Sequence, residues 1–319
     1  MSAHAGVFAS PVDELQHPEL AIWRANVGAP VALDLAPARE APVAGIDLLS
    51  WNVAVGAGRL TALLERLADG AWGGAGRDPG RPLLVLVQEA FRSDPSVPDW
   101  PESGRHGGAL HPAEPEDIAD VARAFSLSLR YAPSMRNGLH ASDRGNAILS
   151  AAPLGTSHAF LLPYVRQRRV VVTAELAALP AIAFASAHLD VSGQAGGRTL
   201  GRFGGGRVLQ ARALAARLLG DDARPIVLGG DLNTPLGLRD PALLTLIRAG
   251  LHPAQRDGNW RGTLRRGPLR LLLDHVLFRP GGQIRSVRVQ RLDESPRRPR
   301  VFGSDHHPLL ARIELGEPD

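Results

Sequence analysis

The chain has 319 residues, of which 44% are hydrophobic and 21% are charged. This composition can fill the core of one large domain or two small ones, and it excludes a largely disordered protein. The absence of cysteine excludes disulfides, a thiolate nucleophile and cysteine-ligated zinc, so any metal must be held by oxygen or imidazole groups. All 36 basic residues are arginine, but the net charge is only +4, which does not indicate a surface that is basic all over.

The first residues lack the basic segment followed by an apolar segment that marks a signal peptide. The longest apolar runs have the length of strands and fall short of the roughly 18 residues that a membrane span requires. We therefore expect a soluble, cytoplasmic monomer without stable membrane insertion.

Residues 1–44 are rich in Ala and Pro and have no clear periodicity, which predicts an N-terminal arm or extension outside a domain at 45–319. Short apolar runs follow from Ile46 onward, bordered by Gly or Pro and often ending in a polar residue. This pattern favours buried strands over helices. The predicted strands are 46–52, 83–89, 146–150, 170–176, 181–188, 226–231 and 271–278.

Three stretches have helical periodicity. Leucines recur at helical spacing over 60–67, with Gly70 placed to end the helix. The pattern repeats over 208–218 ahead of Gly220, and 116–125 is a third candidate. Because strands outnumber helices and come in clusters, the sequence predicts an α/β sandwich rather than a strict alternation of strand and helix.

Segment 192–206 is irregular, with seven glycines together with Arg198 and Arg202. One interpretation is a solvated loop without a function. The other is a lid over a substrate, because the segment directly follows a predicted strand. The residues alone leave both interpretations open.

Polar side chains gather where the apolar runs end or begin, which is where rigid scaffolds present catalytic groups to a shared cleft. Taken singly, several have plain structural explanations, because a Gly-Gly-Asp-Leu-Asn stretch suits a turn and a lone histidine is more often structural. The adjacent Asp and His ahead of the last apolar run are harder to dismiss. The candidate residues are Asn52, Glu89, His188, Asp231, Asn233, Asp274, Asp305 and His306.

In their order along the chain, these motifs resemble those of the deoxyribonuclease I-like endonuclease/exonuclease/phosphatase superfamily. They are Asn, Gln-Glu, His-Leu, Gly-Asp-x-Asn, Asp-His and Ser-Asp-His, and the resemblance covers roughly 45–315. It implies an α/β fold of four layers, an α-β-β-α sandwich, with 45–319 as the catalytic domain. It also implies hydrolysis of phosphate esters by a metal-activated water.

The resemblance implies a site for one hard cation or two. Glu89 matches the carboxylate that binds the catalytic cation, Asn52 lies beside it in the motif set, and Asp305 is a further ligand. Oxygen ligands together with substrate phosphate suit Mg²⁺ or Mn²⁺. The sequence does not decide the number of metal ions.

The resemblance also gives the remaining residues roles. Asp231 matches the aspartate that positions or deprotonates the attacking water, and Asn233 matches its orienting partner. His306 matches a histidine that contacts the scissile phosphate, with Asp274 as its carboxylate partner, and His188 matches a second histidine facing the phosphate. A carboxylate beside a histidine fixes the ring tautomer and favours the protonated form, but whether Asp231 or His306 is the general base stays open.

Neighbouring residues carry weaker signals. Among Arg166, Arg168 and Arg169 we expect Arg169 to reach the substrate phosphate, with a solvated strand edge as the alternative. His307 points away from His306 if the segment is extended, so we interpret it as structural. Asp274 lies within an apolar run, where a lone buried carboxylate would be destabilising, so it needs a partner.

The substrate class is less determined than the chemistry. Residues 256–300 contain 12 arginines against four acidic residues, a surplus that could hold the backbone of a nucleic acid or could be a basic face without a partner. We therefore favour a nuclease slightly over a sphingomyelinase-like enzyme or an inositol or sugar phosphate phosphohydrolase. A catalytically inactive binding module is a more distant alternative, because all of the motif residues are present.

Overall fold

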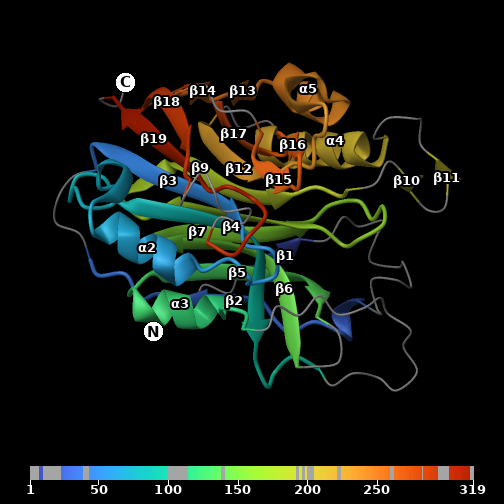
Figure 1. Cartoon of the computed structure of the whole chain (residues 1–319), viewed down its shortest axis with the longest axis horizontal. Helices are drawn as coiled ribbons and strands as arrows, with labels where there is room; N and C mark the ends of the chain where they lie inside the picture. The colour runs from blue at the N-terminus through green and yellow to red at the C-terminus, as the bar shows by residue number, and fades with distance from the viewer. Residues whose placement is uncertain are drawn as a thin grey trace.

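Two mixed β-sheets lie face to face in the computed structural model (Figure 1). The first sheet has the order β1 (Val7–Ala9), β7 (Leu154–Leu161), β8 (Val170–Leu176), β9 (Leu179–His188), β12 (Ile226–Asp231), β17 (Asp274–Arg279) and β13 (His252–Pro253). The second sheet has the order β14 (Gln255–Arg256), β18 (Ile284–Arg291), β19 (Leu309–Leu315), β3 (Gly45–Asn52), β4 (Leu83–Ser93), β6 (Ser142–Ser150), β5 (Ser128–Arg136) and β2 (Val31–Leu33).

The structure describes residues 7–9, 23–38, 43–98, 114–137, 141–191, 194–195, 198–199, 205–220, 224–258, 262–281, 283–293 and 302–316. Most of the glycine-rich segment 192–206 lies outside this part, apart from the short strands β10 (Gln194–Ala195) and β11 (Arg198–Thr199) and the start of a helix. Within the described residues, no helix combines the length and apolarity needed to cross a bilayer.

Helices cover the outer faces of both sheets and complete the four layers that the resemblance implied (Figure 1). α2 (Leu60–Ala68) and α3 (Ile118–Ala124) pack on the second sheet. α4 (Gly205–Leu219) and α5 (Pro241–Arg248) pack on the first sheet. The three helices predicted from periodicity are confirmed. α5 was not predicted, although Asp240 caps it and Pro241 occupies its first turn.

Alternation along the strands explains why three separate apolar layers form. In β3, Ile46 and Leu48 face the core between the sheets, whereas Leu49 and Trp51 face α2. Successive side chains of a strand point to opposite faces, so a strand with apolar residues on both faces serves both layers. β3 is buried at every position and is detectable in the sequence as a mainly apolar run, although Asp47 and Ser50 interrupt it.

The predicted strand 271–278 is wrong in its first part. Leu271 belongs to β16 (Leu269–Leu271), which pairs with β15 (Leu264–Arg266) in a separate hairpin. The backbone amides of Leu273 and Asp274 both donate to Thr263 Oγ1, each at 3.0 Å. A side chain thus takes the place of a strand partner here, and β17 begins only at Asp274.

The predicted N-terminal extension, 1–44, contributes one edge strand to each sheet. β1 pairs in parallel with β7, and β2 pairs antiparallel with β5. These pairings cover the backbone of two outer strands, which would otherwise present unpaired hydrogen-bonding groups. The described parts of the extension therefore lie at the periphery of the sandwich.

Gly229 and Gly230 lie inside β12 rather than in a turn. A Cβ at Gly229 would press on Leu86 and Ser50 of the opposite sheet, and a Cβ at Gly230 would overlap the backbone oxygen of Ala187 in the neighbouring strand. Glycine is therefore required sterically at both positions, directly ahead of Asp231. The close approach of the two sheets at this end of the sandwich depends on it.

We predict that Gly230→Ala destabilises the protein by about 1–3 kcal/mol or more, the range for overpacking a close-packed interior. The measurement is the urea midpoint at unchanged m-value. Gly220→Ala is the control, because its Cβ would meet the nearest atom, Ala216 O, at an ordinary 3.6 Å. Equal midpoints for the two variants would contradict this account.

Candidate active site

Strand pairing brings three of the predicted residues into one row. β12 lies between β9 and β17, with Asp231 directly opposite His188 on one side and Asp274 on the other. All three are buried. Because directly paired residues of neighbouring strands point to the same face of a sheet, the three side chains point together into the space at this end of the sandwich.

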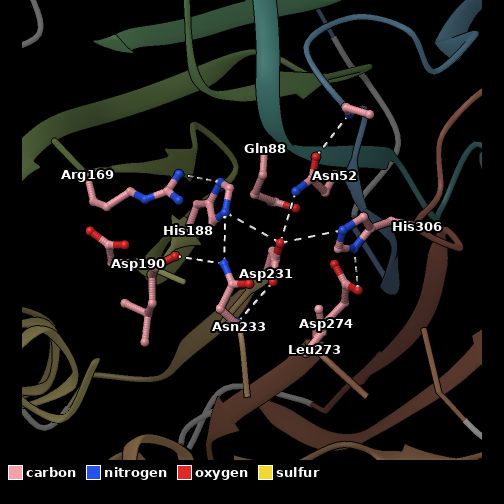
Figure 2. Close-up of polar contacts among 12 residues, drawn as sticks. Asn52, Gln88, Arg169, His188, Asp190, Asp231, Asn233, Leu273, Asp274 and His306 are labelled. Carbon is pink, nitrogen blue, oxygen red and sulfur yellow. Dashed lines mark hydrogen bonds and ion pairs between the residues drawn. The ribbon is translucent and has the colours of Figure 1, made fainter. Parts of the chain in front are cut away.

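The second sheet reaches this row through Asn52, the last residue of β3. Its amide Nδ2 donates to Asp231 Oδ2 at 2.9 Å, and its Oδ1 accepts from the backbone amide of Ala54 at 3.0 Å (Figure 2). Deeper between the sheets, Gln88 Nε2 donates to Ser186 Oγ at 3.0 Å. These hydrogen bonds fix the distance between the two sheets where the functional side chains emerge.

The segment before β19 is held against the end of β3 by two hydrogen bonds. Ser304 Oγ donates to the backbone oxygen of Asn52 at 2.7 Å, and Trp51 Nε1 donates to the backbone oxygen of His306 at 2.9 Å. Asp305 and His306 are thereby brought to the same end of the sandwich, although more than 250 residues separate them from β3 in the chain.

His306 pairs with Asp274, as the resemblance implied. Its Nδ1 lies 2.8 Å from Asp274 Oδ2, and its Nε2 lies 3.8 Å from Asp231 Oδ2. Burial alone would lower the pKa of His306, but the carboxylates of Asp274 and Asp231 outweigh it and raise the pKa to about 10. The ring is therefore protonated at neutral pH and carries a proton toward Asp231.

Asp231 lies at the centre of the hydrogen-bond network (Figure 2). Its Oδ1 accepts from the backbone amide of Asn233 at 2.9 Å, while its Oδ2 faces Asn52 and both histidines. Burial and the nearby charge of Asp274 raise the pKa of Asp231 to about 7, against the opposing effect of His306. At neutral pH the group most central to the network is thus divided between its ionised and protonated forms.

His188 has a different partner and a different charge. Arg169 Nη1 lies 3.0 Å from His188 Nδ1, and since a guanidinium only donates, Nδ1 must be the acceptor. The proton of the neutral ring then lies on Nε2, which faces Asp231 Oδ2 at 3.4 Å and also lies 3.1 Å from Asn233 Nδ2. Burial, together with the charge of Arg169, holds the pKa of His188 well below its usual value, so the ring is neutral.

Glu89 stands on a distorted part of β4. The pairing of β4 with β6 shifts between Val87 and Ala90, and Glu89 has a left-handed φ of 54°. A bulge of this kind turns a side chain away from the direction that regular pleating would give it. Here it turns Glu89, which is partly buried, into the cleft.

Other residues with left-handed backbone also border the cleft. Ala54, Val55 and Asn233 have φ values of 49°, 60° and 49°. Asparagine tolerates this region, but alanine and a β-branched valine do so only under strain. Such conformations persist where surrounding structure imposes them.

A cleft of about 560 Å³ opens over these side chains. Eight of the nine residues predicted as site residues line it, and the ninth, Asp274, lies behind His306. The structure also brings in residues that the sequence did not single out. These are Ala54, Val55, Ala57, Arg144, Gln167, Val191, Leu264 and Leu273.

The neighbours of the predicted residues have structural partners. His307 lies 2.7 Å from Asp293 Oδ1, away from the cleft, as predicted. His275 Nε2 lies 2.7 Å from Thr234 Oγ1 and does not contact Asp274. Arg168 and Arg169 are both buried, so the alternative of a solvated strand edge is wrong for them, while Arg166 is exposed.

Two sets of side chains offer oxygen or nitrogen ligands to a metal. One ligand atom each from Asp231, Asp274 and His306 lie within 4.8 Å of one another, but the protonated His306 ring already balances the charge of these carboxylates. Glu89 and Asp305, by contrast, are partly exposed in the cleft beside Asn52. Partly solvated carboxylates fit a hard cation that keeps some of its waters.

The model of the Endonuclease/Exonuclease/phosphatase family matches residues 49–306. The chain therefore belongs to this family, whose members are phosphoesterase-type hydrolases that typically depend on a divalent metal. A search of curated proteins gave no match.

Solved structures agree in fold. An endonuclease/exonuclease/phosphatase from Beutenbergia cavernae is 18% identical with a TM-score of 0.57, over 85% of this chain and 72% of that one. The human Nocturnin catalytic domain with bound sulfate is 15% identical with a TM-score of 0.54, over 90% and 98%. Sphingomyelinase C from Streptomyces griseocarneus is 17% identical with a TM-score of 0.51, over 84% and 99%.

Buried His275 makes stability depend on pH. Burial lowers its pKa from 6.5 to about 4 in the folded protein. Between these two values the unfolded chain binds a proton that the folded chain does not, so lowering the pH favours unfolding by about 1.4 kcal/mol per pH unit for this group. We predict that His275→Gln, which cannot protonate, flattens the fall in unfolding free energy from pH 6.5 to pH 4. Parallel profiles in urea titrations of the two proteins would exclude His275 as the cause.

Proposed function

We propose that this protein is a divalent-metal-dependent phosphodiesterase that uses Mg²⁺ or Mn²⁺, with nucleic acid favoured over lipid or sugar phosphates as substrate. One observation carries the proposal. The network centred on Asp231 and the pair of His306 with Asp274 open into the same cleft as the carboxylates of Glu89 and Asp305. That cleft offers groups for an attacking water, for phosphate oxygens and for a cation.

Asp231 is the residue best suited to align and deprotonate the water. Its Oδ2 faces the other side chains of the site. Hydrogen bonds from the Asn233 backbone amide and the Asn52 side chain fix the carboxylate from two directions. His306 is less suited to act as a base, because Nδ1 is committed to Asp274 and Nε2 already carries a proton. In this scheme the water proton passes to Asp231 as the new oxygen–phosphorus bond forms and the bond to the leaving oxygen breaks.

The two histidines would contact the reacting phosphate, and Arg169 would orient His188 beside it. The His306 ring, which is a cation, would donate a hydrogen bond from Nε2 to a non-bridging phosphate oxygen. The neutral His188 ring, oriented by Arg169, would donate to the phosphate from its own Nε2. A cation bound by Glu89 and Asp305, with Asn52 beside them, would supply further neutralisation of charge on the phosphate and the leaving oxygen. No covalent enzyme intermediate is needed.

The preference for nucleic acid rests on the hairpin of β15 and β16. Leu264 forms a bridge with His306, and the amide of Arg265 donates to the backbone oxygen of Asp305 at 3.0 Å. The exposed side chain of Arg270 lies on the same hairpin. Part of the arginine-rich region 256–300 thus borders the cleft, where guanidinium groups could contact backbone phosphates rather than bases.

The test of the proposed function is a panel of substrates with Mg²⁺, Mn²⁺ or chelator. We expect cleavage of bis-p-nitrophenyl phosphate and plasmid DNA that requires the metal. Binding of DNA should fall with salt by roughly 0.9 log units per contacted phosphate for each decade of salt. RNA, sphingomyelin and inositol phosphates complete the panel, and a preference for any of them would replace nucleic acid as the substrate class.

In the same panel, Glu89→Gln should weaken magnesium binding in calorimetry while leaving the thermal midpoint close to that of the wild type. An unchanged magnesium titration in this variant would remove Glu89 as a ligand.

A pair of adjacent histidines provides a matched test of the catalytic assignment. We predict that His306→Ala lowers turnover by roughly 10²–10⁴-fold, as expected for losing a proton-transfer or phosphate-contacting group. His307→Ala should leave the chemistry nearly intact, because His307 contacts Asp293 outside the cleft. Asp274→Asn should share the defect, and its combination with His306→Ala should fall well short of additivity, since the two act as a unit. The reverse ranking of the two histidine variants would refute the assignment.

A further inference from the structure

Two arginines in the wall of the cleft have no acidic partner within the part of the chain that the structure describes. Arg144 of β6 and Arg169 at the start of β8 both line the cleft. Among the described residues, neither guanidinium forms an ion pair with a carboxylate. Buried or half-buried guanidinium groups are normally paired, so this wall differs from the rest of the molecule, where arginines such as Arg92 pair with aspartates.

Arg169 is only 2% exposed, and its hydrogen-bond partners among the described residues are neutral. Its Nη1 donates to His188 and its Nη2 donates to Gln167 Oε1 at 2.7 Å, while its Nε has no hydrogen-bond partner. Burial lowers its pKa, and the acidic groups at longer range, Glu89 first among them, offset this only in part. A charge in this setting favours an anion that could approach from the cleft.

Arg144 reaches the same wall from a distorted stretch of β6. The pairing of β5 with β6 is irregular between Pro133 and Met135, which lies opposite Arg144. Arg144 Nη1 donates to Asn137 Oδ1 at 2.9 Å, and its Nε has no partner. The charge of Arg144 lowers the pKa of both Arg169 and His188, so the two guanidinium groups lie close enough to repel each other.

The charges divide the cleft into two ends. Asp305 and the carboxylates around His306 make one end acidic, and Arg169, on the far side of His188, makes the other end basic (Figure 2). Arg144 adds its charge to the basic end from β6, beside the part of β4 that carries Glu89. A volume of about 560 Å³ is within the range of sites that hold whole small molecules and is more than one phosphate group requires. The basic end is therefore available to a part of the ligand other than the reacting phosphate.

We propose that Arg144 and Arg169 form a second anion site, which binds a phosphate group of the substrate other than the one that is hydrolysed. The inference rests on the proposed phosphodiesterase function and narrows its substrates to molecules with at least two phosphate groups. Such molecules are polynucleotides or small molecules with two phosphates. Two guanidinium groups suit this role, because each offers several donors to phosphate oxygens.

The first test measures binding without catalysis. In metal-free buffer, the wild type should bind pyrophosphate more tightly than inorganic phosphate in calorimetry. Arg144→Met should reduce pyrophosphate affinity by roughly 10-fold or more, as expected for the loss of charge-assisted hydrogen bonds. Arg144→Lys should retain part of the affinity, which shows that the loss follows charge rather than folding. Arg217→Met, at an exposed position of α4 outside the cleft, is the matched control.

The second test compares substrates with one and two phosphate groups. A dinucleotide with a 5′-terminal phosphate is set against the same dinucleotide without it, and an inositol bisphosphate against a monophosphate. In each pair, kcat/KM for the substrate with two phosphates is divided by kcat/KM for the substrate with one. This ratio should exceed one in the wild type and in Arg217→Met. It should approach one in Arg144→Met, because KM for the substrate with two phosphates rises. The pair that shows the larger ratio identifies the source of the second phosphate.

The outcomes separate the two proposals. An Arg144-dependent preference for pyrophosphate without metal-dependent hydrolysis of any phosphodiester would reject the function and keep the anion site. Hydrolysis with no preference for a second phosphate, or with the same preference in Arg144→Met, would reject the anion site and keep the function.

Discussion

The hydrogen bond from Asn52 Nδ2 to Asp231 Oδ2 joins the ends of the two sheets, and the geometry of the cleft depends on it. A carboxylate that is 2% exposed is stable only when it is hydrogen-bonded. Asn52 meets this need from the opposite sheet and Asn233 from the strand's own continuation. The sheets can approach closely enough for this contact because Gly229 has no side chain between them. At this end of the sandwich, the packing of the core and the geometry of the site therefore depend on the same contact between the sheets.

The two histidines beside Asp231 differ in charge because their partners differ. His306 has a carboxylate on its Nδ1 and is protonated, whereas His188 has a guanidinium on its Nδ1 and is neutral. The same residue type thus supplies a cation on one side of Asp231 and a neutral donor on the other. Neither state follows from the histidine itself, and exchanging the partners would exchange the roles.

Some of this arrangement could be predicted from the sequence, for a physical reason. Strands such as β3 and β12 are buried on both faces, so they appear as mainly apolar runs with a polar residue at the end. β7 and β18 were missed because their buried and exposed positions are mixed, which weakens the apolar signal. α5 was missed although Asp240 and Pro241 mark its start, and its length does not explain this, since α3 is one residue shorter and was found.

Within the site, residues at the ends of predicted strands were found, whereas Arg144, which lies within an irregular stretch of β6, was not. Asp231 and His188 follow from strand ends that lie in register. Arg144 lines the cleft because of an irregular pairing of β5 with β6, and an irregularity of this kind leaves no trace in hydrophobic periodicity. Glu89 was found as the polar end of an apolar run, and the resemblance supplied its role, although its direction depends on a bulge. Pattern analysis therefore detects the regular part of the scaffold better than its distortions.

Left-handed backbone at Ala54, Val55, Glu89 and Asn233 surrounds the cleft on several sides. Each such residue outside glycine raises the energy of the folded state, by about 1–3 kcal/mol in unfavourable cases. At the rim of the cleft, the backbone therefore adopts strained conformations that direct particular side chains. Laboratory evolution for heat resistance alone would be drawn to Ala54, Val55 and Glu89, since glycine or asparagine at these positions relieves strain. Evolution for turnover would resist the same changes, so the two selections would diverge first at the rim of the cleft.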